Sequence, residues 1–361
     1  MRQIIPYRSD IPFRLIFFLA RGNPYYTGVI YFVLSYAVLS LLWLATGRSM
    51  RAPAVDHVNI GVLAPIGAGL LCHFYNVVTS SFEAIATRGI IRRDGQGDYL
   101  KFLPRLEGLY NNWYVTGAAL LASLLLNGWN YMAKKDSWLG LNGGAVAIYG
   151  RLFITLNFYI IGVMVYKSII TVWALRRVLE HHKIVVRPLH PDRCGGLRPI
   201  GRLSLAVNYF VGLVMLYFAL AFLFDPLARL NPLYVGLYAG FYVGCPLLLF
   251  ASLSKAHRKM AEEKQRVLGR LSKAFDHYYA QLVTGPPDEA LDLACAESVS
   301  RTYDLYEVAA RMPVWPFDVR SLVRILGTYV LPAIVFAVDQ LSSPDSVVRD
   351  LYGAARTFLE P

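Results

Sequence analysis

Histidine, aspartate and cysteine side chains lie close together in one polar loop between two apolar runs. His190, Asp192 and Cys194 alternate along the chain, and His181 or His182 could add a fourth donor. Imidazole nitrogen, carboxylate oxygen and thiolate sulfur all bind transition metals. The same loop contains Pro-Asp and Gly-Gly steps, which are frequent in turns. The pattern therefore fits either a metal site or a structural turn between two helices.

A second group of polar residues falls inside a long apolar run. Asn157, Ser168 and Thr171 lie on one stripe of the predicted helix, with Lys167 beside it. A lysine at this depth is costly unless it lines a water-filled path, pairs with an acid or extends to the headgroups. No acidic residue lies deep in any apolar run, which weakens a proton-relay interpretation. The four residues are candidates for the lining of a pore.

His73 and Asn76 lie in another apolar run, which is rich in small residues. Small residues let membrane helices approach closely, and polar side chains can form hydrogen bonds to a neighbouring helix. Two interpretations follow for His73 and Asn76. They either hold helices together or form a further part of the pore lining.

The sequence contains none of the short motifs that mark common enzyme chemistry. We find no G-x-S-x-G elbow, no Walker A sequence, no H-E-x-x-H pair and no Rossmann glycine pattern. The cysteines do not have the spacing of a zinc site. We therefore expect no catalytic residue and no cofactor, and the only metal-ligand candidates are those of the loop: His190, Asp192 and Cys194.

Two segments carry a resemblance to a group of proteins. His190-Pro-Asp-Arg-Cys-Gly-Gly-Leu197 resembles the H-P-D-x-x-G-G-L loop of an uncharacterised group of bacterial multi-pass membrane proteins. Pro313-Val-Trp-Pro-Phe-Asp318 is similar to a later segment of the same group. The resemblance implies a membrane protein and implies no reaction.

Long apolar helices are the elements that would position these residues. Hydrophobic residues make up 56% of the chain and charged residues 17%, whereas soluble domains have about a quarter charged residues. A helix needs about 20 apolar residues to cross a bilayer. The sequence predicts an all-α multi-pass bundle of about seven spans, and the last can instead re-enter the membrane: 25–46, 60–80, 113–132, 152–175, 205–224, 233–253 and 319–338.

Basic residues alternate between the two ends of the predicted spans. The net charge is +12, and Lys and Arg cluster before the first span and after the second, fourth and sixth. The positive-inside rule places these clusters, and the N-terminus, in the cytoplasm. With seven spans the C-terminus lies on the opposite side of a bacterial inner membrane. Basic residues next to apolar runs suit anionic headgroups, so we expect no nucleic-acid partner.

The predicted chain has four parts. Residues 1–24 form an interfacial segment and residues 25–253 form a bundle of six spans. Residues 254–316 form a cytoplasmic helical hairpin broken at Gly285-Pro286-Pro287. Its apolar stripe must be buried against itself, another loop or a second subunit. Residues 317–361 form the seventh span, or a re-entrant segment, and the C-terminal tail.

Three functions are compatible with these features. The first is a homo-oligomeric channel or pore, with a preference for anions because its cytoplasmic mouth is basic. The second is a membrane-embedded sensor or scaffold whose hairpin binds a cytoplasmic protein. The third is a membrane enzyme that uses His190, Asp192 and Cys194. The lipid bilayer is a partner in all three.

Overall fold

The structure is a computed structural model that describes residues 4–46, 57–133, 144–182, 184–186, 190, 192, 194–224, 232–284, 289–316 and 319–342. These residues are predominantly helical, and no β-strand occurs among them. One isolated antiparallel bridge joins Ile91 to Ile184. The predicted all-α fold class is confirmed.

The first apolar run forms a helix that begins where the sequence predicts. The Asn23 side chain accepts hydrogen bonds from the backbone N–H groups of Tyr25 and Tyr26, and Pro24 takes the first helical position. This is the preferred arrangement at a helix N-terminus. The elements up to the first long helix are α1 (Ile11–Leu19), α2 (Pro24–Phe32), a π-helical turn (Val33–Ala37), α3 (Val38–Ala45), a second π-helical turn (Asn59–Leu63) and α5 (Ala64–Thr87).

The rest of the described chain alternates long helices with short connections. The remaining elements are a 3₁₀ turn (Arg93–Gly95), α6 (Gln96–Tyr110), α7 (Trp113–Ala133), α9 (Gly144–His181), α10 (Arg198–Phe224), α12 (Pro232–Thr284), α13 (Glu289–Ala310) and α14 (Val319–Ser342).

Among the described residues, four helical segments are long and apolar enough to cross a membrane. They are Pro24–Ala45, Asn59–Thr87, Gly144–His181 and Arg198–Phe224, and Val323–Val338 is a shorter apolar helix. These coincide with the predicted first, second, fourth, fifth and seventh runs. The chain is therefore a membrane-compatible helical protein, and the count of seven spans stays a prediction.

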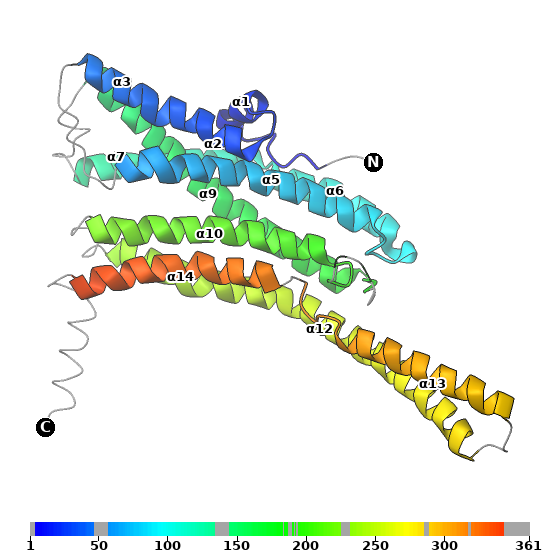
Figure 1. The fold of residues 1–361 in the computed structure, drawn as a ribbon. Helices are drawn as coiled ribbons and strands as arrows, with labels where there is room; N and C mark the ends of the chain where they lie inside the picture. The colour runs from blue at the N-terminus through cyan, green and yellow to red at the C-terminus, as the bar shows by residue number, and fades with distance from the viewer. Residues whose placement is uncertain are drawn as a thin grey trace, which may run out of the picture.

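The long helices lie side by side in one bundle (Figure 1). Helix α5 packs against α2 and α10, α7 packs against α9, and α14 packs against α10. The contact between α10 and α14 is close at Gly212, where an added Cβ would lie 2.8 Å from Thr328 Cβ. Small residues permit this approach of two backbones in a membrane.

Helices α12 and α13 form a hairpin that projects far beyond the bundle (Figure 1). We call the part of α12 from Glu262 to Thr284, together with α13, the stalk. Lys264 Nζ donates to the carbonyl oxygens of Ala310 and Met312 and so holds the end of α13 against α12. The stalk is continuous with the bundle because α12 is a single helix of 53 residues.

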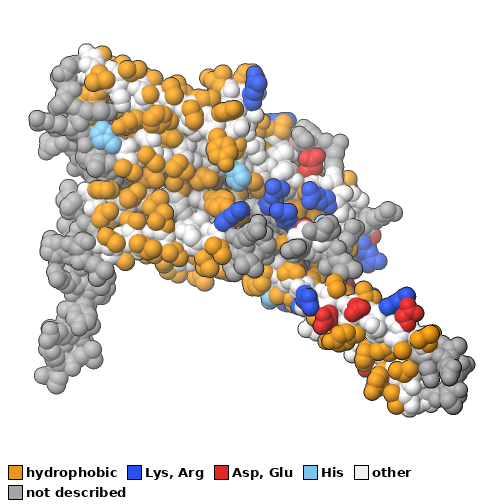
Figure 2. Space-filling model, viewed as in Figure 1, with side chains coloured by type: hydrophobic (Ala, Val, Ile, Leu, Met, Phe, Trp, Pro, Cys, Tyr) orange, Lys and Arg blue, Asp and Glu red, His pale blue; other side chains and the backbone are white. Residues whose placement is uncertain are grey.

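Charged and apolar side chains are separated on the surface (Figure 2). Orange apolar side chains cover the visible face of the bundle, and Lys and Arg side chains gather toward the stalk. We call this end, where α5 and α9 finish and α10 begins, the basic end. It is the end that the sequence predicts to be cytoplasmic.

Candidate functional site

Lys167 is buried in the bundle and is bonded on every side. Its side chain is 1% exposed. Its Nζ donates to Pro6 O at 2.6 Å, to Asp10 Oδ2 at 2.5 Å and to Tyr75 Oη at 2.9 Å. An ammonium has three N–H donors, so each has a partner. The lysine pairs with an acid and does not extend to the surface.

Asp10 is the acid, and its carboxylate is fully buried. Tyr75 Oη donates to Oδ2, and Tyr159 Oη donates to Oδ1 at 3.2 Å. Asp10 stands at the N-cap position of α1, yet its side chain makes no cap hydrogen bond there. It points instead into the bundle, where it joins the N-terminal segment to α5 and α9.

The segment around Asp10 is wedged among several helices. Phe13 stacks on Tyr31 of α2 and Tyr159 of α9, with ring centroids 5.9 and 6.2 Å apart. Phe17 meets Tyr75 of α5 edge-on. Asn111, after α6, donates to Ile5 O at 2.7 Å. Residues 4–19, which we call the N-terminal plug, therefore pack one face against α2, α5, α6 and α9, while Ile11, Leu15, Phe18 and Leu19 on the other face are exposed.

Other residues of the predicted stripe on α9 also make contacts inside the bundle. Asn157 Oδ1 accepts from Tyr31 Oη at 2.6 Å, and Thr171 Oγ1 lies 2.7 Å from Tyr110 Oη. The Asn157 Nδ2 and Ser168 Oγ atoms are buried with no hydrogen-bond partner. Polar groups thus follow α9 through the bundle core, and two of them are unsatisfied.

His73 and Asn76 take different positions on α5. Asn76 Nδ2 donates to Gly22 O at 2.8 Å and so ties α5 to the turn between α1 and α2. The ring of His73 lies 6.4 Å from that of Tyr209 on α10 and lines an apolar groove on the outside of the bundle. The structure therefore does not bring these two residues to Lys167.

The loop before α10 is organised by Asp192. Its Oδ1 accepts from the backbone N–H of Cys194 at 2.9 Å and of Gly196 at 3.0 Å, and its Oδ2 accepts from Arg198 N at 3.3 Å. His190 Nδ1 lies 2.9 Å from Asp192 Oδ1. Burial raises the pKa of Asp192, but these hydrogen bonds outweigh it and leave the pKa below its ordinary value.

The two glycines of this loop adopt backbone angles that suit a turn. Gly195 and Gly196 have φ of +63° and +89°, where residues with a Cβ are strained. The described loop residues thus have the geometry of a turn that leads into α10. Within the ranges that the structure describes, no group of three or more His, Cys, Asp or Glu side chains is placed to hold a metal ion.

Three members of the buried cluster were not predicted: Asp10, Tyr75 and Tyr159. The tyrosines give no signal, because aromatic residues are common in membrane helices. Asp10 does give a signal in the sequence, since it is the only acidic residue among the first 55 of the chain. A lone acid in a basic, apolar segment is a candidate partner for a lone intramembrane lysine. Comparison with protein-family models, with curated proteins and with solved structures gives no match to this chain.

Proposed function

We propose that the chain is the subunit of a homo-oligomeric membrane channel that its own N-terminal plug closes. The ion pair between Asp10 and Lys167 carries the proposal, because the two side chains are 0% and 1% exposed. Ionisable residues inside a membrane bundle are rare, and most of them serve a pathway or a switch.

A buried ion pair is a weak source of stability. The desolvation of two charges offsets most of their attraction, so an apolar pair of similar volume is often as stable. The pair does make the position of the plug depend on the charges of Asp10 and Lys167. If the Asp10 carboxylate leaves, Lys167 remains as an unpaired charge, and water must enter to solvate it.

The path that opens would follow α9. Withdrawal of the plug frees Lys167, Tyr159 and Tyr75 from Asp10, and removes Phe13 from between Tyr31 and Tyr159. The Asn157 and Thr171 side chains lie further along the same helix. A path with an unpaired lysine in its wall favours anions.

The stalk supports the homo-oligomeric part of the proposal. Among the described side chains of the stalk, α12 is net basic, with Lys264, Arg266, Arg270 and Lys273 against Glu262, Glu263 and Asp276. Helix α13 is net acidic, with Glu297, Asp304 and Glu307 against Arg301. The α12 face of one copy therefore complements the α13 face of another. Apolar side chains are exposed on both helices and need a cover: Tyr279, Val283, Leu293, Tyr303, Leu305 and Val308.

The base of the stalk is attached to the helix that carries Lys167. Lys255 of α12 pairs with Glu180 near the end of α9, and Lys259 Nζ donates to Leu179 O and His182 O. These contacts bind α12 to the C-terminal carbonyls of α9. A movement of the stalk would therefore act on α9 and on the plug that α9 holds.

The test is the current across a planar bilayer that contains the purified full-length protein. Asp10→Asn removes the acidic charge at nearly constant volume, so we expect more frequent opening than in the natural protein. Lys167→Met should reduce the preference for anions in the currents that remain. Lys101→Gln, at an exposed position of α6, serves as the control and should behave like the natural protein.

Silence of the natural protein and of both variants, with insertion shown by protease mapping, would contradict the channel proposal. The second function, a scaffold whose stalk binds a protein, would then be favoured by the exposed apolar side chains of the stalk. A partner recovered with the natural protein and lost on Leu305→Glu would support that function.

A further inference from the structure

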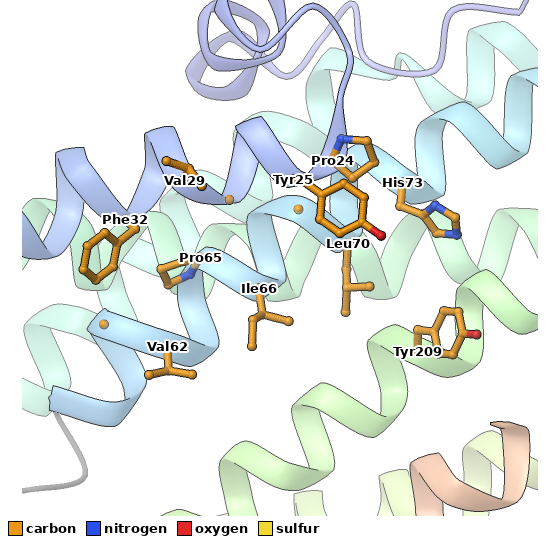
Figure 3. A pocket seen from close by; sticks show the side chains of 13 residues that line it. Pro24, Tyr25, Val29, Phe32, Val62, Pro65, Ile66, Leu70, His73 and Tyr209 are labelled. Carbon is orange, nitrogen blue, oxygen red and sulfur yellow. The ribbon is translucent and has the colours of Figure 1, made fainter.

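An apolar groove runs along the outside of the bundle between α2 and α5, with Tyr209 of α10 at one end (Figure 3). Its volume is about 580 Å³, within the range of small-molecule sites. The residues that line it are Pro24, Tyr25, Gly28, Val29, Phe32, Gly61, Val62, Pro65, Ile66, Gly69, Leu70, His73 and Tyr209.

The groove opens toward the surface that the membrane would cover. It belongs to three of the four segments that are long and apolar enough to span a bilayer. Val29 and Ile66 line it and are 59% and 46% exposed. Figure 2 shows the apolar side chains that continue over this face of the bundle. A hydrocarbon chain is the natural occupant of such a position.

One end of the groove is polar. In Figure 3, Phe32 and Val62 lie toward one end, and His73 and Tyr209 lie toward the other. Arg202 is exposed and lies seven residues, or about two turns, before Tyr209 on α10, so the two side chains share one face of that helix. The polar end is therefore the one nearer the basic end of the bundle.

A second arginine is close in sequence to this polar end. Arg21 is exposed and comes three residues before Pro24, which lines the groove. Its neighbour Gly22 is bonded through its carbonyl to Asn76, one turn of α5 beyond His73. One arginine on α10 and one just before α2 thus belong to the two segments that bring the groove to the basic end.

We propose that the groove binds one phospholipid with an anionic headgroup. An acyl chain lies along the apolar floor between α2 and α5. The phosphate lies at the polar end, between Arg202 and Arg21, and within reach of His73 and Tyr209. Charge complementarity selects the headgroup, and the apolar length of the groove selects a lipid over free phosphate.

The test is a binding titration by native mass spectrometry of the full-length protein in detergent. The probes are phosphatidylglycerol and phosphatidylcholine with the same acyl chains. We expect phosphatidylglycerol to bind more tightly. Arg202→Gln should weaken phosphatidylglycerol about fivefold, the effect of one basic residue near an anionic headgroup, and leave phosphatidylcholine unchanged.

Two further variants distinguish the contribution of the headgroup to binding from that of the acyl chain. Ile66→Trp fills the groove and should weaken both lipids, while Arg202→Lys should retain the preference for phosphatidylglycerol. Lys101→Gln, at an exposed position of α6, is the control for the loss of one basic charge. Equal affinities for the two lipids, or an equal effect of Arg202→Gln and Lys101→Gln, would overturn the proposal. Unchanged binding by Ile66→Trp would do so too.

Discussion

Lys167 and Asp10 are 157 positions apart in the sequence, and their Nζ and Oδ2 atoms lie 2.5 Å apart inside the bundle. Each partner comes from a different kind of segment. The lysine belongs to α9, which is long and apolar enough to span a membrane, and the aspartate directly precedes the short helix α1. The ion pair thus joins the N-terminal segment to α9.

The ion pair should show strong coupling in its effect on stability. We expect Asp10→Asn or Lys167→Met alone to reduce the free energy of unfolding by about 3–5 kcal/mol, because each leaves an unpaired buried group. The double variant should recover most of that loss. Thermal unfolding in detergent measures it. Lys101→Met, which breaks an exposed pair with Asp98, is the control and should change stability by under about 1 kcal/mol.

Gly212 should be intolerant of even a small side chain. An added Cβ would meet Thr328 Cβ at 2.8 Å and Thr328 O at 3.0 Å, so α10 and α14 would have to separate. We expect Gly212→Ala to cost about 1–3 kcal/mol, the usual effect of overpacking. Gly117→Ala on α7 meets nothing within 4 Å, so its melting temperature should stay the same or rise. Equal melting temperatures for the two variants would contradict the close packing.

The loop before α10 should loosen in acid. The pKa of Asp192 lies below its ordinary value, so its ionised form stabilises the loop above pH about 4, the ordinary value of the unfolded chain. The contribution declines as the pH falls through the lower pKa of the folded state. The buried Cys194 thiol reports on this. Acid slows all alkylation because the thiolate is the reactive form, so the rate is compared with that of the denatured chain at the same pH, and this ratio should rise as the loop opens.

Asp192→Asn should remove that pH dependence. The amide oxygen can still accept a hydrogen bond, but it lacks the charge that strengthens three backbone contacts. We expect Cys194 in the variant to react faster than in the natural protein near neutral pH, and at a similar rate in strong acid. Alkylation under denaturing conditions provides the reference rate. The same slow rate in both proteins at neutral pH would rule out the role of Asp192.

The stalk should hold copies of the chain together. We expect Leu305→Glu and Val308→Glu to shift the full-length protein toward smaller assemblies, because each places a charge on an exposed apolar position of α13. Light scattering after gel filtration measures the mass. Ser300→Glu on the same helix is the control. An unchanged mass for both leucine and valine variants would place the contact between copies elsewhere.

Charge reversal gives an independent test of the same surface. Lys273→Glu on α12 or Asp304→Lys on α13 should weaken assembly by setting like charges against each other. The combination should restore assembly if α12 of one copy meets α13 of the next. Weakening without restoration would mean that the two helices do not face each other between copies.

The sequence by itself determined the class of the protein and the beginning of α2, whereas α9 and α10 begin several residues before the predicted runs. Apolar runs of about 20 residues predict helices wherever they occur, because a backbone in lipid must satisfy its hydrogen bonds internally. The start of α2 at Asn23 and Pro24 follows from local capping, which involves only neighbouring residues. The break predicted at Gly285-Pro286-Pro287 lies outside the described residues, between the end of α12 and the start of α13.

Only the tertiary structure decided what the polar residues do. The sequence shows that Lys167 needs a partner, but the acid comes from a segment expected to lie at the membrane interface, outside every predicted span. Asn157, Thr171 and Asn76 likewise bond to distant segments of the chain. These pairings depend on how helices cross in three dimensions. A periodic pattern along one helix shows which face is buried, but it does not show which other segments pack against that face.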